Sequence, residues 1–382
     1  MIQELRAKFI DLYSVTPRMF RSPGRINIIG EHTDYNDGFV LPAAIDKEIV
    51  FAVAPNTTGT FRLYAADLND FGEFPDVVPQ TDKKWANYLL GVVAQMQKKG
   101  FHVPSVDVVF GGNVPLGAGL SSSAALECGF AYALNAIFEF GFSTIELVKM
   151  SQLTEHEFVG LRCGIMDQFA VMFGKKDSVV RLDCRSLEYQ HFPFILNDYA
   201  IVLCNSNVKH ELASSEYNVR RHEGEEGVRV LSSHYPEIRS LRDATLEQLE
   251  CCKSEMSEKS YMRCKYVIEE NQRVLTACEA MLRGDIETVG KMMYATHEGM
   301  SKLYEASCKE IDEMVDIART SSDVVGSRIM GGGFGGCTIS VVKKSAVEDF
   351  KQIMNEQYYK KYNTPSVIYD IVVSDGTNEI ML

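Results

Sequence analysis

Hydrophobic and polar positions along the first half of the chain alternate between a helical and an extended spacing. Helical spacing predicts helices, and Val- and Phe-rich runs bounded by Pro, Asn or Gly predict strands. The predicted helices are 1–13, 85–100 and 122–138. The predicted strands are 39–56, 61–68 and 106–112. A glycine-rich loop therefore connects the last of these strands to the start of a long helix.

The second half shows the same two spacings, but helical patterns dominate it. Two further helices are predicted at 143–158 and 167–173, and a strand follows at 178–184. We expect a new sheet to begin within 188–206, then helices over 214–321. The segment 326–344 is expected to be a loop that leads into a strand, followed by one more helix and a last strand at 368–375. These patterns place a boundary near Asn197, giving domains 1–197 and 198–382, and the cleft between them is the default binding site.

Composition narrows the class of protein. A chain of 382 residues with 46% hydrophobic and 24% charged residues is typical of globular proteins and long enough for two cores. Its net charge of −13 repels phosphate backbones and anionic lipid surfaces, so nucleic acid and membranes are not expected partners. The ten cysteines show no C-x-x-C spacing, and no apolar run reaches membrane-spanning length. We expect a cytoplasmic protein.

Residues 21–42 concentrate polar groups in a glycine-containing stretch that we interpret as a connection between two strands. Arg25, Glu31, His32 and Asp34 lie in it. Each alone is more simply explained as part of a solvated loop. Together they offer several short acceptors and donors, which is what discrimination between sugar epimers requires.

Residues 111–127, GGNVPLGAGLSSSAALE, combine spaced glycines with three consecutive serines at a predicted helix start. Gly117 and Gly119 allow backbone amides to approach an anion, and the serine hydroxyls suit phosphate or magnesium. An ordinary serine-capped helix is the alternative. The segment has neither the G-K-[ST] of a Walker loop nor a dinucleotide fingerprint.

Three other places hold candidate chemistry. Glu155 and Asp167 flank a turn and could face one cleft, as a magnesium ligand and a general base, although a surface position is commoner for either acid alone. Tyr217, in the segment 210–223, has an apolar face that suits a pyranose ring or, equally, a protein core. The glycines of 331–336 precede a strand and indicate a close passage of backbone past a ligand or past the other domain.

Taken together, these segments resemble the GHMP small-molecule kinases, and within them the galactokinase family. GRINIIGEHTDYNDGFVLP is similar to the galactokinase signature, while GAGLSSSAALE and GGGFGGCTI resemble the second and third GHMP motifs. WANY, CGIMDQF and SSEYNVRR also match galactokinases. The resemblance extends from about residue 18 to 339. It implies a two-domain α/β (α+β) fold, with an N-terminal half like ribosomal protein S5 domain 2 and a ferredoxin-like C-terminal half.

The resemblance also implies a reaction and a set of site residues. The expected reaction is in-line transfer of the γ-phosphate of ATP to the C1 hydroxyl of galactose by a monomer. The residues expected to bind the sugar are Glu31, His32, Asp34, Gly164 and Tyr217. Those expected around ATP are Gly117, Ala118, Gly119, Leu120, Ser121, Ser122 and Ser123, with Trp85 near adenine. Ser123 (or Ser122) and Glu155 are expected to hold Mg²⁺, Asp167 to act as base and Arg25 as transition-state cation.

Two alternatives stay open at this point. A related kinase could act on N-acetylgalactosamine or arabinose, and Thr33 favours plain galactose by resemblance. A non-catalytic galactose sensor is the alternative from another class. Such sensors are expected to lack part of the Ser-Ser-Ser-Ala stretch, which is complete here at 121–124.

Overall fold

The computed structural model describes residues 1–115, 117–208 and 213–382. Residues 210–212 of the predicted segment 210–223 and residue 116 of the glycine-rich loop therefore lie outside the described residues. The helices of the N-terminal half are α1 (Ile2–Tyr13), α2 (Ala86–Lys98), α3 (Ser122–Phe138), α4 (Thr144–Thr154) and α5 (Met166–Phe173). Each of these corresponds to a predicted helix, and α3 has the predicted bounds.

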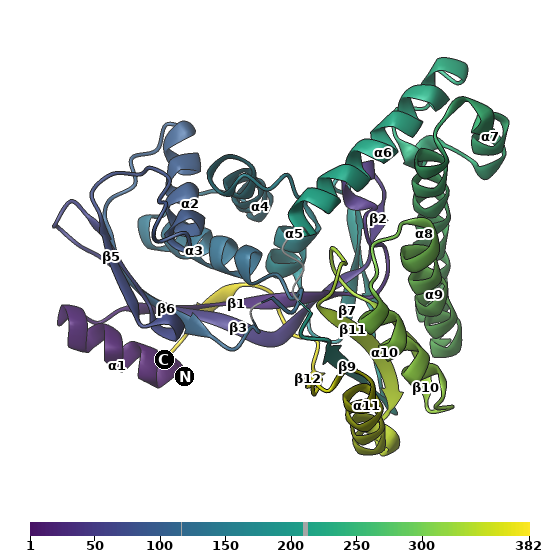
Figure 1. Ribbon diagram of the computed structural model, residues 1–382. Coiled ribbons are helices and arrows are strands. Elements are labelled where there is room, and N and C mark those ends of the chain that lie inside the picture. Colours follow the sequence, from purple (N-terminus) through teal and green to yellow (C-terminus); the bar gives the residue numbers. More distant parts are fainter. Residues whose placement is uncertain (116, 209–212) are drawn as a thin grey trace.

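A mixed sheet forms the base of this half. Its strand order is β13 (Asn378–Ile380), β1 (Arg18–Asn27), β3 (Pro42–Pro55), β6 (Val106–Gly112), β4 (Phe61–Ala65) and β5 (Asp70–Phe74). Helices α2 to α5 lie over one face and α1 lies against the other (Figure 1). The strands β3 and β6 are buried along nearly their whole length, because helices cover them on both sides.

A small second sheet joins β2 (Phe39–Val40), β7 (Ser178–Asp183) and β8 (Tyr189–Pro193). Within the segment 188–206, the first strand, β8, still pairs with the preceding strand β7 and does not begin the new sheet. The new sheet begins at β9. Its strand order is β10 (Val324–Ile329), β11 (Cys337–Lys343), β9 (Tyr199–Asn205) and β12 (Val367–Ile371), all antiparallel.

Helices dominate the C-terminal half, as predicted for 214–321. They are α6 (Ala213–His234), α7 (Leu246–Cys251), α8 (Glu258–Leu282), α9 (Ile286–Glu298) and α10 (Lys309–Arg319), followed later by α11 (Val347–Tyr362). α6 starts between the two halves and runs outward along the C-terminal half (Figure 1). α9, α10 and α11 pack on the four-stranded sheet.

The end of the chain returns to the first sheet, which the local pattern did not predict. The predicted last strand 368–375 corresponds to β12, but a further strand, β13, pairs antiparallel with β1. Thr377 supports this return, since its N–H donates to the carbonyl of Val171 at 2.9 Å and its hydroxyl lies 2.9 Å from that of Ser22. The largest hydrophobic cluster likewise contains residues from both sides of position 197, so the domain boundary stays a prediction.

Candidate active site

A bulge in β1 places Arg25 against the glycine-rich turn that precedes α3. The pairing of β1 with β3 shifts between Pro23 and Arg25, so the strand bends there. Gly24 lies in the bend, and a Cβ on it would be 2.8 Å from the carbonyl of Leu120. The Arg25 N–H donates to that same carbonyl at 3.1 Å. Arg25 therefore belongs to a strand, where the sequence had indicated a connection, and the bulge docks it on the glycine-rich turn.

Asp167 lies in the first turn of α5 and forms an ion pair with Arg25. Nε and Nη2 of Arg25 each donate to a separate Asp167 oxygen at 2.8 Å, which is the bidentate geometry that suits a guanidinium and a carboxylate. The Ser121 hydroxyl donates to Oδ2 as well. The Arg25 side chain is 5% exposed and that of Asp167 is 30% exposed, so the acid can be reached from the cleft while its partner is buried.

The turn before α3 has the backbone that a phosphate site needs. Gly117, Gly119 and Ser121 have φ values of 73°, 72° and 57°, a left-handed conformation that glycine adopts at little cost. α3 then begins at Ser122, so the unpaired N–H groups and the positive end of the helix dipole lie at this turn. Nη1 of Arg25 donates to the carbonyl of Gly119 and fixes the turn beside Asp167.

The predicted sugar residues and both predicted catalytic residues line one cavity of about 300 Å³, at the lower end of the size range of small-molecule sites. These residues are Arg25, Glu31, His32, Asp34, Gly164, Asp167 and Tyr217. The cavity is completed by Leu161, Cys163, Met166 and the turn Gly331–Phe334. Residues from β1, α5, α6 and the β10–β11 connection thus meet at one place, where the two halves of the chain adjoin.

Asp34 and Gly164 fit against each other. A Cβ on Gly164 would lie 1.7 Å from Oδ2 of Asp34, so only glycine leaves room for the carboxylate there. Burial, with the nearby charges of Asp167 and Glu31, raises the pKa of Asp34 to about 7. The Tyr35 N–H, at 3.0 Å from Oδ1, opposes this shift. The Asp34 carboxyl is thus held next to other negative charges, so it favours neighbouring groups that donate hydrogen bonds, such as hydroxyls.

His32 is neutral and both of its ring nitrogens have partners. Nε2 lies 3.2 Å from the carbonyl of Gly332, which can only accept, so Nε2 carries the proton. Nδ1 therefore accepts from the Tyr35 hydroxyl at 2.6 Å, and that hydroxyl in turn accepts from Tyr304 at 2.8 Å. Burial lowers the pKa of His32 to about 3. A sugar hydroxyl could bond to His32 only by replacing one of these partners.

Thr33 does not line the cavity. Its single hydroxyl proton is shared within the loop between the carbonyls of Gly30, at 2.9 Å, and Phe39, at 2.6 Å, and the residue is fully buried. These bonds close the loop that carries Glu31, His32 and Asp34. Thr33 therefore shapes the site from behind, and any effect on sugar choice has to pass through the loop.

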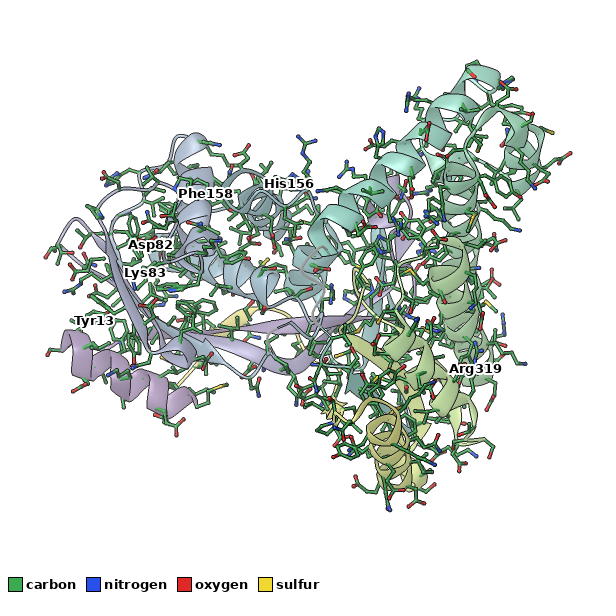
Figure 2. The ribbon with its side chains drawn as sticks, in the orientation of Figure 1. Tyr13, Asp82, Lys83, His156, Phe158 and Arg319 are labelled. Carbon is green, nitrogen blue, oxygen red and sulfur yellow. The ribbon has the colours of Figure 1, made fainter. Side chains whose placement is uncertain are left out.

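A second, more apolar cavity of about 490 Å³ lies on the other side of the serine turn. Its lining includes Trp85, Tyr88, Phe110, Ser122, Ser123 and Leu126. The indole N–H of Trp85 donates to Asp70 at 2.7 Å, which fixes the ring, and Phe110 lies 5.6 Å away. The adjacent Lys83 also bonds to Asp70 and lies in the N-terminal half (Figure 2). An apolar cavity whose lining includes serine hydroxyls suits a nucleotide base followed by phosphates.

Glu155 begins a π-helical turn, Glu155–Val159, which extends α4. Burial raises its pKa to about 7, and a bond from the Ser123 hydroxyl opposes the shift. Its Oε2 is buried and has no hydrogen-bond partner among the described residues. Glu127, one turn after Ser123 on α3, is also buried with an unpartnered oxygen, and burial raises its pKa strongly. Two buried carboxyls with unpartnered oxygens next to a serine fit a divalent cation.

No group of three or more His, Cys, Asp or Glu side chains in the described ranges is arranged to hold a metal alone. Mg²⁺ in phosphate-transfer sites usually binds through one or two carboxylates and the phosphates of the substrate. Ser123 and Glu155 stay the predicted ligands.

Sequence reasoning missed several residues of this site. Arg328 bonds to Glu31 and Tyr35 bonds to His32, while the ring centroid of Tyr304 lies 4.6 Å from that of His32. The single charged residue in VVGSRI, the sequence of strand β10, was an available signal, since a buried arginine must be paired. The two tyrosines carried no such signal, because their pairing crosses 269 residues.

Family models and known proteins match this chain, and the match to known proteins covers most of its length. A galactokinase galactose-binding signature matches residues 7–55, and the N-terminal and C-terminal domain models of GHMP kinases match 87–175 and 277–360. Galactokinase from Thermotoga maritima is 44% identical, over 94% of this chain and 99% of its own length. Galactokinase from Roseiflexus sp. is 40% identical, over 99% and 97%. This chain belongs to the galactokinase family.

Solved structures show how far the similarity extends. The crystal structure of Lactococcus lactis galactokinase complexed with galactose superposes with a TM-score of 0.95 at 30% identity, covering 99% of both chains. Methanococcus jannaschii mevalonate kinase shares the fold alone, with a TM-score of 0.65 at 15% identity over 94% of this chain. The predicted GHMP fold is therefore confirmed, and the whole chain is built like a galactokinase.

Proposed function

We propose that this chain transfers the γ-phosphate of ATP to the C1 hydroxyl of galactose, giving galactose 1-phosphate. The observation that carries the proposal is the position of Asp167. It lies in the sugar-sized cavity, is held by Arg25, and is bonded to Ser121 of the turn that leads to the second cavity. A hydroxyl bound at Asp167 would therefore be next to phosphates bound at the turn.

Asp167 would accept the proton of the attacking hydroxyl. An ionised carboxylate offers about four acceptor positions. Three are taken here, one on Oδ1 by Arg25 and two on Oδ2 by Arg25 and Ser121. The remaining position, on Oδ1, is where the C1 hydroxyl would donate. Because two charge-assisted bonds stabilise the ionised form, we infer that proton transfer is late, after the bond to ADP has largely broken.

Arg25 would stabilise the transferring phosphoryl group. A guanidinium has five N–H donors, of which Nε, one on Nη1 and one on Nη2 are used within the protein. One N–H on each terminal nitrogen remains for the equatorial phosphoryl oxygens. Since Arg25 is already fixed by Asp167 and Gly119, it needs little reorganisation when charge develops, which is the condition for effective electrostatic catalysis.

The sugar would be read by Glu31, Asp34 and the backbone at Gly164, with the ring of Tyr217 against one face and His32 behind them. A site that bonds each hydroxyl rejects an epimer, since a buried acceptor is then left unpaired. Trp85 would lie against adenine, and the turn 117–123 would hold the phosphates. Magnesium held by Ser123 and Glu155 would neutralise charge on the β and γ phosphates.

Two other functions are less well supported. A kinase for N-acetylgalactosamine or arabinose would turn over another sugar faster than galactose, and a galactose sensor would bind galactose without releasing ADP. The whole-chain match to galactokinases, together with the complete serine stretch at 121–124, favours catalysis on galactose.

Release of ADP should be measured with galactose, glucose, N-acetylgalactosamine and arabinose in turn. Galactose is expected to give the highest kcat/KM by at least tenfold. Faster turnover of another sugar, or galactose binding without ADP release, would contradict the proposal.

We further propose that the protein works in the cytoplasm as a monomer. All ten cysteines are free thiols, which is usual in a reducing compartment. Within the described ranges, no helix is long and apolar enough to cross a membrane. The residues predicted to bind the sugar and to act in catalysis already meet in one cavity of this chain, and that predicted set needs no residue from a second copy.

A further inference from the structure

Arg328 is a charged side chain in the interior of the molecule. It lies on β10, and its side chain is fully buried. Nε donates to the carbonyl of Ile28 at 2.7 Å, and the terminal nitrogens donate to the carbonyls of Asn27 and Ile329. A buried guanidinium is tolerated only when its donors are bonded and its charge is paired. These bonds join a strand of the C-terminal half to the end of β1.

The charge of Arg328 is paired with Glu31, across 297 residues of sequence. Nη2 of Arg328 donates to Oε1 of Glu31 at 2.9 Å, and the N–H of Gly331 donates to the same oxygen at 2.9 Å. Oε1 is thereby fully used. Oε2 has no hydrogen bond to any residue in the described ranges, and Glu31 lines the sugar cavity. One oxygen is fixed by the protein, so the other is left for a ligand.

The glycine turn after β10 supports both Glu31 and His32. The Gly331 N–H bonds Glu31, and the next carbonyl, of Gly332, accepts from His32. Gly331 and Gly333 have φ values of 80° and 85°, which an L side chain rarely adopts. A Cβ on Gly333 would also lie 2.2 Å from the carbonyl of Ala306. Only glycine therefore fits these two positions, and the turn presents one donor to Glu31 and one acceptor to His32.

We propose that Arg328, together with the Gly331 N–H, is a positioning element for sugar specificity. By occupying Oε1 of Glu31, they leave only Oε2 to accept a hydrogen bond, and they fix its direction into the cavity. A carboxylate held in this way recognises one hydroxyl at one place on the ring, whereas a freely rotating carboxylate would accept hydroxyls at several. The proposal rests on the proposed galactokinase function and deepens it.

The first experiment identifies the hydroxyl that Glu31 reads. Dissociation constants are measured for galactose and for its 2-, 3-, 4- and 6-deoxy analogues, with the native protein and with Glu31→Gln. The analogue that lacks the hydroxyl bonded by Glu31 should bind both proteins about equally, because it makes no bond to the side chain that is changed. The other sugars should bind the variant about 10 to 100 times more weakly, as expected for loss of a charge-assisted bond. If Glu31→Gln weakens every analogue to the same extent, the proposal is wrong.

The second experiment tests Arg328 through the same set of sugars. Arg328→Lys keeps the charge but loses the fork that reaches Glu31 and the strand carbonyls together. Galactose should bind about 10 to 100 times more weakly, while the analogue identified above should change by less than about threefold. Ser327→Ala is the matched control. Ser327 is the adjacent buried residue, bonded to Ser340 at 2.8 Å, and its loss should leave the sugar profile unchanged.

Gly331→Ala provides a second variant in case Arg328→Lys does not fold. It keeps the buried ion pair and strains only the turn that supplies the second donor, so it should give the same sugar-selective loss. A uniform loss for all sugars in both variants would mean that Arg328 only holds the fold, and would overturn the proposal. ADP release by the native protein with galactose tests the function separately, so failure of that assay and failure of the inference are distinguishable.

Discussion

Gly164→Ala is the substitution that examines the sugar site with the smallest change. The added Cβ would lie 1.7 Å from Oδ2 of Asp34 and 2.1 Å from its Cγ, whereas ordinary contact begins at 3.4 Å. The φ of Gly164 is not positive, so alanine introduces no backbone strain. The carboxylate therefore has to move away by about 1.7 Å, which is more than a hydrogen bond can stretch and survive.

The expected cost follows from that displacement. At pH 8, above the pKa of about 7, Asp34 is mostly ionised, and loss of one hydrogen bond to this charged acceptor is worth about 1.5 to 3 kcal/mol, or roughly a 10- to 150-fold weakening. We expect KM for galactose to rise by about that factor. KM for ATP should change by less than about twofold, because Asp34 lies in the sugar cavity and not in the cavity of Trp85. Steady-state ADP release at varied galactose and varied ATP measures both.

Gly224→Ala is the matched control, since a Cβ there would meet nothing closer than 3.7 Å. The double variant Asp34→Ala with Gly164→Ala checks the mechanism. If Gly164→Ala acts by displacing Asp34, it should add little once the carboxylate has been removed. An unchanged galactose KM in Gly164→Ala, or full additivity in the double variant, would refute the reasoning.

Four further changes test the rest of the site. Asp167→Ala should lower kcat by about 10² to 10⁴ while galactose affinity, measured by calorimetry, stays within about threefold; near-native turnover would contradict its role as base. Ser123→Ala should raise the Mg²⁺ concentration for half-maximal ADP release more than Ser122→Ala does, and the reverse order would move the ligand to Ser122. The raised pKa of Glu155, about 7, makes the native stability fall as pH rises from about 4.5 to 7. Glu155→Gln should therefore stabilise the protein by up to about 3 kcal/mol at pH 8 and by much less at pH 4.5. Denaturant unfolding at both pH values measures this, and a difference that does not depend on pH would contradict it. ATP should change the fluorescence of Trp85, the only tryptophan, whereas galactose alone should change it little; no response to ATP would place adenine elsewhere.

Much of this site could be predicted because its parts are local in sequence. The spaced glycines and the three serines at 121–123 predicted a turn that leads into a helix, and Gly117 and Gly119 have the left-handed backbone that such a turn requires. The clustering of Glu31, His32 and Asp34 within four positions was visible in the sequence, and these side chains share a cavity. Turn chemistry and helix starts depend on neighbouring residues, so short segments carry the information.

Other features depend on contacts between distant segments. The pairing of β13 with β1, the path of β8 beside β7 and the clamp of Arg328 on Glu31 join residues whose local patterns say nothing of each other. The pKa of Asp34 also depends on the tertiary structure, because burial and the charges that folding brings close to it raise this pKa.

The amino-acid sequence by itself thus determined the helices, the phosphate-type turn and the family to which the chain belongs. Only the tertiary structure decided which oxygen of Glu31 is free, which nitrogen of His32 carries its proton, and why position 164 must be glycine. The physical reason is that hydrogen-bond saturation and steric exclusion are properties of atoms in contact, and these contacts form when segments as much as 300 residues apart pack together.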